Sequence, residues 1–318
     1  MEIIHLRNKT PLTLNDDYVV AIGNFDGIHI AHEKIIKTAR KIAREKQLKF
    51  GVMCFDIPPR QLVNRIDNYY VLRSFEQKRK ILANLGVEIM FLVHFNTELR
   101  QLSAGDFVEK MIIRNHIKYI VCGYDFKFGF NKSGDVNYLS QFSEFTTIIM
   151  PRYDLNGQRI SSTLINELIL HGEIKQANAL LSEPYSISGK VVHGNHKGKA
   201  IGFPTANIRP LANYRLPQSG VYITKTIVNG QSYHSMTNIG HNPTFNFVNF
   251  QSIETHIFNF DEDIYHQNIE IVFLDYLRKE RIFDSVDDLI KQLSRDKEII
   301  KLYFSTHEGA ERNEKDEN

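Results

Sequence analysis

The chain has 318 residues, with 39 lysines and arginines against 37 aspartates and glutamates, so its formal net charge at pH 7 is +2. This near balance weakens a nucleic-acid-binding interpretation, which calls for a basic domain, and argues neither for nor against phosphate ligands. The length predicts about two domains, each large enough to bury its own core. Two cysteines, Cys54 and Cys122, are too few for a disulfide framework or a cysteine metal site.

The cysteines and the N-terminus also indicate a compartment. Both cysteines lie in apolar runs, which is typical of buried strand thiols in a reducing environment. Met1–His5 lacks the layout of a signal peptide, and no apolar run approaches membrane-spanning length. We therefore expect a cytoplasmic protein that binds neither membrane nor nucleic acid, and these patterns predict no oligomeric state.

The first half of the chain alternates strand and helix patterns. Apolar runs rich in β-branched and aromatic residues predict strands at Tyr18–Ile22, Phe50–Phe55, Glu88–His94, Tyr119–Cys122 and Phe145–Met150. Helical patterns lie between them at His32–Lys46, Ser74–Leu85 and Ser103–Arg114, and a capping box of Ser74 and Gln77 begins the second. The alternation predicts an α/β fold with a doubly wound parallel sheet that binds ligands at the carboxyl ends of its strands.

A phosphate-binding site is expected where the first of these strands meets the next helix. Gly23 to His32 spans this junction, where free N–H groups and the helix dipole point at a ligand. His29 and His32 are three residues apart and share a helix face, so they could hydrogen-bond phosphate oxygens and stabilise charge on a pentavalent phosphorus. A satisfied structural pair is an equally good interpretation of these two histidines alone.

The chain changes character after residue 182. Two helical patterns, Ser162–Leu170 and Glu173–Leu181, lead to a domain boundary at Ser182-Glu183-Pro184. Strand patterns then dominate at Ser186–Val192, Val221–Val228, Gln231–Ile239, Ile253–Phe258 and Asn268–Tyr276, with a hairpin signal at Asn229-Gly230. We expect a C-terminal antiparallel β-barrel packed against one amphipathic helix, Val286–Phe304. The polar tail, residues 305–318, is expected to be disordered.

The six residues Gly202 to Asn207 carry the most specific chemistry of this second half. Pro204 favours extended backbone, so Thr205 and Asn207 share a strand face and place two neutral oxygens side by side. Such oxygens suit Mg²⁺, which takes further ligands from substrate phosphates. The loop around His193–Lys199 predicts a phosphate cover through its glycines and basic residues, which are Gly194, Lys197, Gly198 and Lys199. With the distant carboxylate Glu254 the set suggests phosphoryl transfer, although the hexapeptide alone is also ordinary turn chemistry.

From Tyr185 to about Phe304 the chain resembles riboflavin kinase. The motifs follow in the family's order, at Gly189–Gly194, Gly202–Asn207, Gly220–Tyr222, Asn238–Phe245, Ile253–His256 and Arg278–Phe283. The resemblance implies phosphorylation of riboflavin to FMN with ATP and Mg²⁺. It further implies that Glu254 is the general base, that Thr205 and Asn207 hold Mg²⁺ and ATP phosphates, and that Arg278 contacts the flavin. One departure is His266, where the family usually has glycine; if this position needs a positive φ, the histidine strains its loop.

Residues 1–182 resemble the nucleotidyltransferase module of the bacterial bifunctional riboflavin kinase/FMN adenylyltransferases, or FAD synthetases. The matching motifs are Gly23–His29, Gly123–Gly129 and Ile160–Thr163. The resemblance implies a nucleotide site formed by Gly23, Phe25, Asp26, His29, His32, Asp125, Ser161, Ser162 and Thr163. The two modules predict domains at residues 1–182 and 184–304, which account for nearly the whole chain.

Three positions depart from the nucleotidyltransferase pattern. Ala31 replaces the glycine of His-x-Gly-His, Pro58 the histidine of Thr-Phe-x-Pro-His-Pro, and Asn166 the arginine that ends Ser-Ser-Thr-x-(Ile/Val)-Arg. A methyl group blocks close approach of the backbone to phosphate, proline donates no side-chain hydrogen bond, and asparagine lacks the charged fork of arginine. Because one such donor is typically worth about 10²–10³ in rate, we expect adenylyl transfer to be weak or absent. A basic run nearby offers substitutes, namely Lys34, Lys37, Arg40 and Lys41.

Three hypotheses follow for the whole chain. The first is a bifunctional enzyme that makes FMN and then FAD. The second is a riboflavin kinase whose N-terminal module is an impaired scaffold. The third is a flavin-binding regulator, which the intact set of Thr205, Asn207 and Glu254 disfavours because a binder needs no base.

Overall fold

The computed structural model describes residues 1–6, 15–63, 69–155, 157–194, 197–241 and 251–316. Backbone contacts divide the chain into two compact units. The N-terminal unit comprises Met1–Ser162 and Leu180–Ser182, and the barrel unit comprises Thr163–Ala179 and Glu183–Asn318. The predicted boundary at 182–184 stays a prediction, since the two helices before it group with the barrel.

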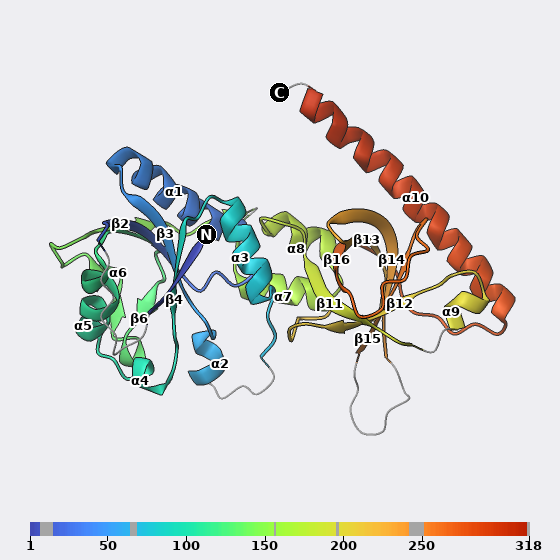
Figure 1. The fold of residues 1–318 in the computed structure, drawn as a ribbon, viewed down its shortest axis with the longest axis horizontal. Helices are drawn as coiled ribbons and strands as arrows, with labels where there is room; N and C mark the ends of the chain where they lie inside the picture. The colour runs from blue at the N-terminus through green and yellow to red at the C-terminus, as the bar shows by residue number, and fades with distance from the viewer. Residues whose placement is uncertain (7–14, 64–68, 156, 195–196, 242–250, 317–318) are drawn as a thin grey trace. The chain divides into compact units, whose positions relative to one another are not determined.

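A parallel sheet with the strand order β1-β4-β3-β2-β5-β8 forms the centre of the N-terminal unit (Figure 1). Its strands are β1 (Glu2–Leu6), β2 (Tyr18–Ile22), β3 (Lys49–Phe55), β4 (Ile89–Val93), β5 (Ile117–Gly123) and β8 (Thr146–Met150). The chain moves outward from β2 in one direction through β3 and β4, then returns to β5 on its other side. This order confirms the doubly wound parallel sheet and places the switch point between β2 and β5. The sequence patterns missed only β1 among these strands.

Helices cover both faces of this sheet. On one face α1 (Ile30–Lys46) and α3 (Phe75–Asn84) bury residues such as Ile36 and Leu82 against the sheet. On the other face α5 (Ala104–Phe107) and α6 (Val136–Leu139) belong to a second core cluster. The predicted capping box of α3 is present in full, because Gln77 N donates to Ser74 Oγ and Ser74 N donates to Gln77 Oε1.

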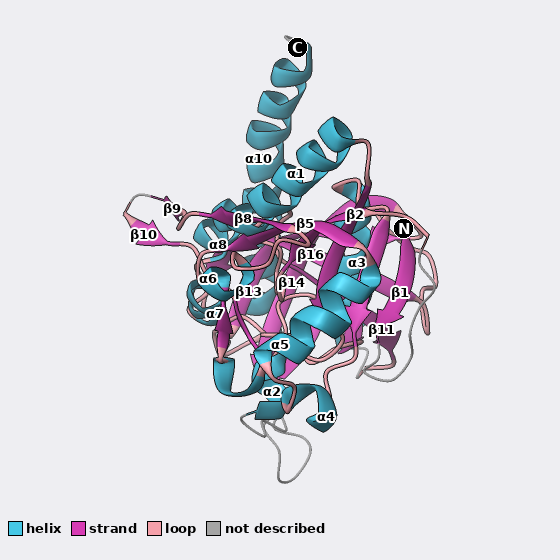
Figure 2. Ribbon diagram, turned by 90° about the vertical axis from the view of Figure 1, so that its left-hand side faces the viewer, coloured by secondary structure: helices cyan, strands magenta, loops and turns pink. Residues whose placement is uncertain are grey.

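The helix predicted at Ser103–Arg114 is wrong in its regularity. After α5 the chain forms a π-helical segment, η1 (Val108–Ile112), and a 3₁₀ turn, η2 (Ile113–Asn115). The Asn115 side chain donates to the carbonyl oxygens of Lys110 and Met111, which competes with the main-chain pattern of a regular helix. The shorter elements of this unit are α2 (Pro59–Val63), α4 (Thr97–Arg100), η3 (Phe130–Lys132), β6 (Lys127–Phe128), β7 (Gly134–Asp135), β9 (Asp154–Leu155) and β10 (Gln158–Arg159). Figure 2 shows the small β9–β10 hairpin standing apart from the main sheet.

The barrel unit is built on a closed barrel of six antiparallel strands in the order β11-β12-β15-β14-β13-β16. Its strands are β11 (Ser186–Val192), β12 (Ala206–Pro210), β13 (Gly220–Val228), β14 (Gln231–His241), β15 (Gln251–Ile257) and β16 (Asn268–Arg278). The predicted hairpin is present, because Val228 pairs with Gln231 and both Asn229 and Gly230 have positive φ, as a type I′ turn requires. This confirms the antiparallel barrel. The apolar patterns predicted no strand at β12, although Pro204 predicted extended backbone where this strand begins.

The barrel interior is partly polar. Five fully buried hydroxyl residues hydrogen-bond to one another inside it: Thr224, Thr226, Ser235, Thr237 and Thr255. Because side chains alternate along a strand, Thr255 turns inward while Glu254 and His256 turn outward. The outer face is therefore where the predicted site residues of β15 lie.

Helices complete the barrel unit. A separate core cluster joins Val221 and Met236 of the barrel to Ile300 and Phe304 of α10 (Val286–Asp316). The helix was predicted to end at Phe304, but it continues to Asp316, so the segment predicted to be disordered is helical as far as the structure describes it. Its glutamates, lysine and alanine are good helix formers, and high polarity alone was a poor guide. The other helices of this unit are α7 (Ser162–Leu170), α8 (Ile174–Leu180) and α9 (Lys197–Ala200).

Candidate functional site

The junction of β2 and α1 forms a tight loop in the N-terminal unit. Gly23 N donates to the carbonyl oxygen of Met53 on the neighbouring strand. Phe25, Gly27 and Ile28 then have φ values of 47°, 75° and 48°. Three left-handed residues within four positions turn the chain sharply into the helix, and backbone strain of this kind is common at functional sites.

The two histidines of this junction lie face to face. His29 is the N-cap of α1, and its Nδ1 accepts a hydrogen bond from His32 N at 3.2 Å. Their rings stack at 3.6 Å between centroids. Burial lowers the pKa of His29 to about 4 and lowers that of His32 well below its usual value. Burial therefore favours the neutral form of both imidazoles, which leaves N–H groups and no charge to offer to a ligand.

Other predicted residues of this unit meet at the same junction. Ser162 Oγ donates to the carbonyl oxygen of Asp26, although the two residues are far apart in sequence. Asp125 forms an ion pair with Arg159, and both charges act on the pKa of His29. Ser161 precedes Ser162 in the chain. The structure thus brings Gly23, Phe25, Asp26, His29, His32, Asp125 and Ser162 into one region, while Thr163 at the exposed start of α7 groups with the barrel unit.

The three departures from the family pattern have different surroundings. Ala31 lies in the first turn of α1, where the predicted close approach to phosphate would occur. Pro58 follows β3 and precedes α2, next to Asp56, which pairs with His94. Asn166 lies on α7, where its Oδ1 accepts from Arg215 Nε at 3.3 Å within the barrel unit.

The basic residues of α1 proposed as substitutes have contacts of their own. Lys34 Nζ lies 3.4 Å from the centre of the Tyr153 ring, and Arg40 donates to the carbonyl oxygen of Leu85. Lys37 and Lys41 form ion pairs with acidic residues of the same helix. None of these contacts directs a cation at the histidines. Sequence reasoning passed over Lys78 of α3, whose charge does act on His32.

The barrel unit carries its predicted residues in one row across paired strands. Glu254 of β15 pairs with Asn207 of β12 on one side and with Asn238 of β14 on the other. Val221 of β13 then pairs with both Asn238 and Arg278 of β16. Residues that pair directly across antiparallel strands have side chains on the same face, so the row gathers groups from five strands at one level of the barrel.

This row borders a cavity of about 380 Å³. Glu254, Asn238 and Arg278 line it together with residues that sequence reasoning did not single out, among them His256 and Glu280. Glu280 accepts a hydrogen bond from Asn238 Nδ2 at 3.2 Å. Burial raises the pKa of the Glu254 carboxyl, and the nearby charge of Glu280 raises it further. The result is a half-buried carboxylate that is more basic than an exposed one.

The hexapeptide Gly202 to Asn207 is held against the barrel by His256. His256 Nδ1 hydrogen-bonds the carbonyl oxygen of Pro204 at 2.7 Å, and its ring lies 5.3 Å from that of Phe203. Thr205 stands just before β12 and Asn207 within it, so both follow Pro204 as predicted. The preceding loop approaches closely: a β-carbon at Gly194 would lie 2.1 Å from Asn207 Nδ2, and one at Gly198 would lie 2.3 Å from the carbonyl oxygen of Phe203. A side chain at Gly198 would therefore clash with backbone, and one at Gly194 would displace the Asn207 amide.

The remainder of the predicted phosphate loop is partly described. Asn195 and His196 lie outside the described residues, as do Asn242 to Phe245 of the predicted motif. Lys197 begins α9, and Lys199 is exposed. His193 stacks on Tyr265 at 4.1 Å, and His266 beside it has a φ of 65°. His266 therefore has the positive φ at which a side chain strains its loop.

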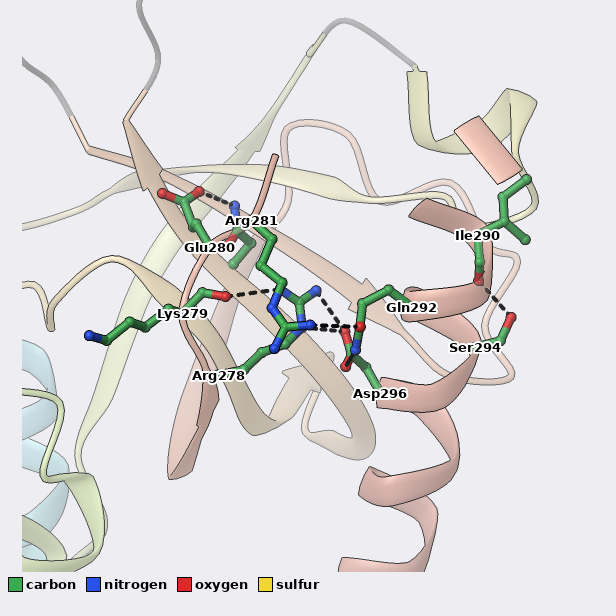
Figure 3. Close-up of polar contacts among 9 residues, drawn as sticks. Arg278, Lys279, Glu280, Arg281, Ile290, Gln292, Ser294 and Asp296 are labelled. Atoms are coloured by element: carbon green, nitrogen blue, oxygen red, sulfur yellow. Dashed lines mark hydrogen bonds and ion pairs between the residues drawn. The ribbon is translucent and has the colours of Figure 1, made fainter. Parts of the chain in front are cut away.

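Arg278, predicted to contact the flavin, forms an ion pair within the protein. Its Nε and Nη2 both contact Asp296 Oδ2, at 2.8 and 2.7 Å, and Gln292 Nε2 donates to the other oxygen of this fully buried carboxylate (Figure 3). Asp296 and Gln292 belong to α10, so the pair fastens the helix to the barrel beside the cavity. The predicted flavin contact of Arg278 stays a prediction.

The predicted metal ligands of the barrel unit suit a magnesium ion that is bound together with the phosphates of ATP. Among the described residues, no group of three or more His, Cys, Asp or Glu side chains could hold a metal ion. The predicted ligands, Thr205 and Asn207, are neutral oxygen donors, which leave the remaining positions of a magnesium ion to phosphate and water.

Comparisons with known proteins match both halves of the chain to related enzymes. The family model described as FAD synthetase matches residues 12–164, and the one described as riboflavin kinase matches residues 181–304. Two curated proteins with the name bifunctional riboflavin kinase/FMN adenylyltransferase are similar: one from Listeria monocytogenes is 36% identical and one from Bacillus subtilis 33%. Each match covers 96% of this chain and 99% of the relative.

A solved structure is similar to this chain over nearly its whole length. This crystal structure, described as a macrolide-efflux protein from Streptococcus pneumoniae, is 33% identical and superposes with a TM-score of 0.87 over 95% of this chain and 99% of that one. In the part of the chain that the structure describes, no helix is both long and apolar enough to cross a membrane.

Proposed function

Because this chain belongs to the family of bifunctional riboflavin kinase/FMN adenylyltransferases, we propose that its two units catalyse consecutive steps. The barrel unit transfers the terminal phosphoryl group of ATP to riboflavin. The N-terminal unit joins the FMN so formed to the adenylyl group of a second ATP. The observation that carries the proposal is the pairing of Asn207, Glu254 and Asn238 across three strands. Glu254 and Asn238 line the cavity together with Thr205.

In the first step Glu254 acts as general base. It takes the proton of the terminal ribityl hydroxyl while that oxygen bonds to the γ-phosphorus, and the bond from this phosphorus to the bridging oxygen of ADP breaks. Its raised pKa, caused first by burial and then by Glu280, makes it a better proton acceptor than an exposed glutamate. The cavity also offers apolar side chains, including Ile201, Leu289 and Leu293, for the flavin ring.

Positioning of ATP falls to the hexapeptide and its loop. Thr205 and Asn207 supply two oxygen ligands for Mg²⁺, which offsets phosphate charge when it is bound. Gly194 and Gly198 allow the backbone of the covering loop to lie against these residues, and Lys197 and Lys199 bring positive charge to the same loop. At the flavin end, Arg278 positions α10 beside the cavity through its ion pair with Asp296.

In the second step a phosphate oxygen of FMN bonds to the α-phosphorus of ATP, and pyrophosphate leaves. The N–H groups of His29, His32 and the first turn of α1 stabilise the charge on the phosphate groups. Ala31, Pro58 and Asn166 each remove an advantage that the family pattern provides, so this reaction is the slower of the two. The relatives' names ascribe both activities to the relatives, and for this chain the weakness of the second is part of the proposal.

One assay tests both steps and the non-enzymatic alternative. The full chain is incubated with riboflavin, ATP and Mg²⁺, and the flavins are separated by chromatography over time. FMN that appears first and FAD that follows slowly is the expected result. FMN without FAD would remove the second step from the proposal, and the absence of both would favour a flavin-binding regulator.

A further inference from the structure

Lys78 is a buried cation in the N-terminal unit. It lies on α3, and only 9% of its surface is exposed. Its ammonium donates to the main-chain carbonyl oxygen of Asn24 at 3.2 Å, in the loop that joins β2 to α1. No carboxylate lies within 4.0 Å of it among the residues that the structure describes, so its only close polar partner there is a neutral carbonyl group.

Such an arrangement is costly in a protein that has no use for it. Burying an ammonium group without a counter-charge is unfavourable, and one hydrogen bond to a carbonyl recovers only a part of the lost hydration. An ammonium group has three N–H donors, and this contact uses one of them. The neighbouring Lys80 on the same helix is exposed, so the burial of Lys78 is not a general property of α3.

The groups around Lys78 are also short of partners. Asn24 Oδ1 and His32 Nδ1 are buried, and neither has a hydrogen-bond partner among the described residues. The pKa of His32 is lowered first by burial, then by His29, and then by the charge of the Lys78 ammonium. Helix α1 is 17 residues long and starts at the same place with its free N–H groups.

We propose that Lys78 is a phosphate-binding residue of the N-terminal site and contacts the polyphosphate of the nucleotide, or the pyrophosphate that leaves. This inference rests on the proposed adenylyl transfer. A phosphate placed at the start of α1 would supply the missing counter-charge of Lys78 and face the N–H groups of His29 and His32.

The experiment separates charge from structure with two substitutions. Lys78→Gln keeps a donor for the Asn24 carbonyl oxygen and removes the charge, whereas Lys78→Met removes both. Lys80→Met is the matched control on the exposed side of the helix. All three are made in the full chain together with Thr205→Ala and Asn207→Ala, which remove the proposed phosphate ligands of the barrel unit.

Inorganic pyrophosphate is titrated into each protein by calorimetry at a temperature where all remain folded. We expect Lys78→Gln and Lys78→Met to weaken binding at least about tenfold, as the loss of a charge-assisted hydrogen bond does, and Lys80→Met to change it less than twofold. A purely structural tether predicts that Lys78→Gln binds pyrophosphate like the parent. That result, or a parent chain that binds no pyrophosphate, would overturn the proposal.

Failure of the proposed function gives a different pattern. If the unaltered chain makes FMN but no FAD, adenylyl transfer is lost, yet the pyrophosphate titration still tests Lys78. If FAD is made and Lys78→Gln in the otherwise unaltered chain makes it at the parent rate, the function stands and the role of Lys78 falls.

Discussion

The two units place their reactive groups on different kinds of backbone. In the barrel unit Asn207, Glu254 and Asn238 are held by strand pairing, so each position is determined by the register of the sheet. In the N-terminal unit the histidines are held by a loop with three left-handed residues and by the first turn of one helix. A site on paired strands depends on the whole barrel, whereas a site on a loop depends on the individual residues that shape it.

The two sites also differ in the side chains that burial perturbs. The half-buried carboxylate Glu254 has a raised pKa and lines the barrel cavity with the exposed Glu280 and the arginines Arg278 and Arg281. The N-terminal site holds the buried cation Lys78, the buried carboxylate Asp26 and two histidines whose pKa burial lowers. A base that receives a proton suits the first arrangement, and an anionic phosphate chain suits the second. A change of pH is therefore expected to affect the stability of the two units in opposite ways.

The largest expected effect is on the base of the barrel unit. Glu254→Gln keeps the shape of the side chain and removes the proton acceptor, so we expect FMN formation to fall by about 10²–10⁴. FAD formation from added FMN should remain, because it takes place in the other unit. Glu262→Gln, an exposed carboxylate of the barrel unit, is the matched control. Turnover of riboflavin at the parent rate in Glu254→Gln would contradict the assignment.

Acid is expected to weaken the N-terminal unit next. Burial holds the pKa of His29 at about 4, while an unfolded histidine binds a proton near pH 6.5. Above about pH 6.5 protonation of His29 does not affect the free energy of unfolding. As the pH drops toward 4, the unfolded chain binds this proton more readily than the folded one, and the free energy of unfolding falls by about 3 kcal/mol. This loss of stability can be measured by hydrogen exchange of the α1 amides between pH 7.5 and 4.5, with the rates corrected for their intrinsic pH dependence.

Glu254 gives the opposite sign in the barrel unit. Its pKa is raised in the folded state, so protonation at low pH removes an unfavourable buried charge, and this contribution to stability is lost as the pH rises. Amides of β15 should therefore not follow those of α1. A His29→Gln chain, which cannot take up the proton, should lose much of the pH dependence of α1; an unchanged dependence would be the contrary result.

The proposed slowness of adenylyl transfer can be tested at the three residues that depart from the family pattern. Restoring the family pattern by Ala31→Gly, Pro58→His and Asn166→Arg is expected to raise the rate of FAD formation by about 10² or more, since one phosphate donor is typically worth that much. Riboflavin phosphorylation should not change. The rates are measured with FMN supplied directly. No gain from the triple substitution would mean that Lys78 and its neighbours already fulfil these roles.

A smaller effect is expected from the second carboxylate of the barrel site. Glu280→Gln can still accept the hydrogen bond of Asn238 but carries no charge, so the pKa of Glu254 should fall. Because Glu254 works in its deprotonated form, the acidic limb of the kcat/KM profile for riboflavin should move to lower pH, by less than about one unit. Asp261→Asn, an exposed carboxylate, should leave the limb in place. A shift to higher pH would contradict the proposed influence of Glu280.

Sequence periodicity predicted most strands and helices because their apolar faces repeat regularly. It missed β12, which is short, carries Pro210 and has one buried residue, Ile208. The hexapeptide and Glu254 were proposed as site residues from local motifs and a family resemblance. Their pairing with Asn238 was not, because register between strands that are distant in sequence depends on closure of the barrel.

Two other features gave no readable local signal. Arg278 was assigned to the flavin, but its partner Asp296 comes from the following helix, and no spacing rule connects a strand end to a helix interior. Lys78 stands on an amphipathic helix where a lysine is usually solvated, and only the packing of α3 against the sheet shows that it is buried. Both omissions concern long-range charge contacts.

The smallest expected effect concerns the loop that carries His266 in the barrel unit. Its φ of 65° is a conformation in which a side chain is strained and glycine is not, so His266→Gly should relieve about 1 kcal/mol of strain. The imidazole also contacts His193 edge to face at 5.5 Å, and the substitution loses this contact. His266→Ala loses the contact as well but keeps a β-carbon, so the difference in the free energy of unfolding between the Gly and Ala chains isolates the backbone term. We expect the Gly chain to have the higher free energy of unfolding in urea. If its value is equal to or lower than that of the Ala chain, the loop holds a residue with a side chain in the left-handed backbone conformation without strain.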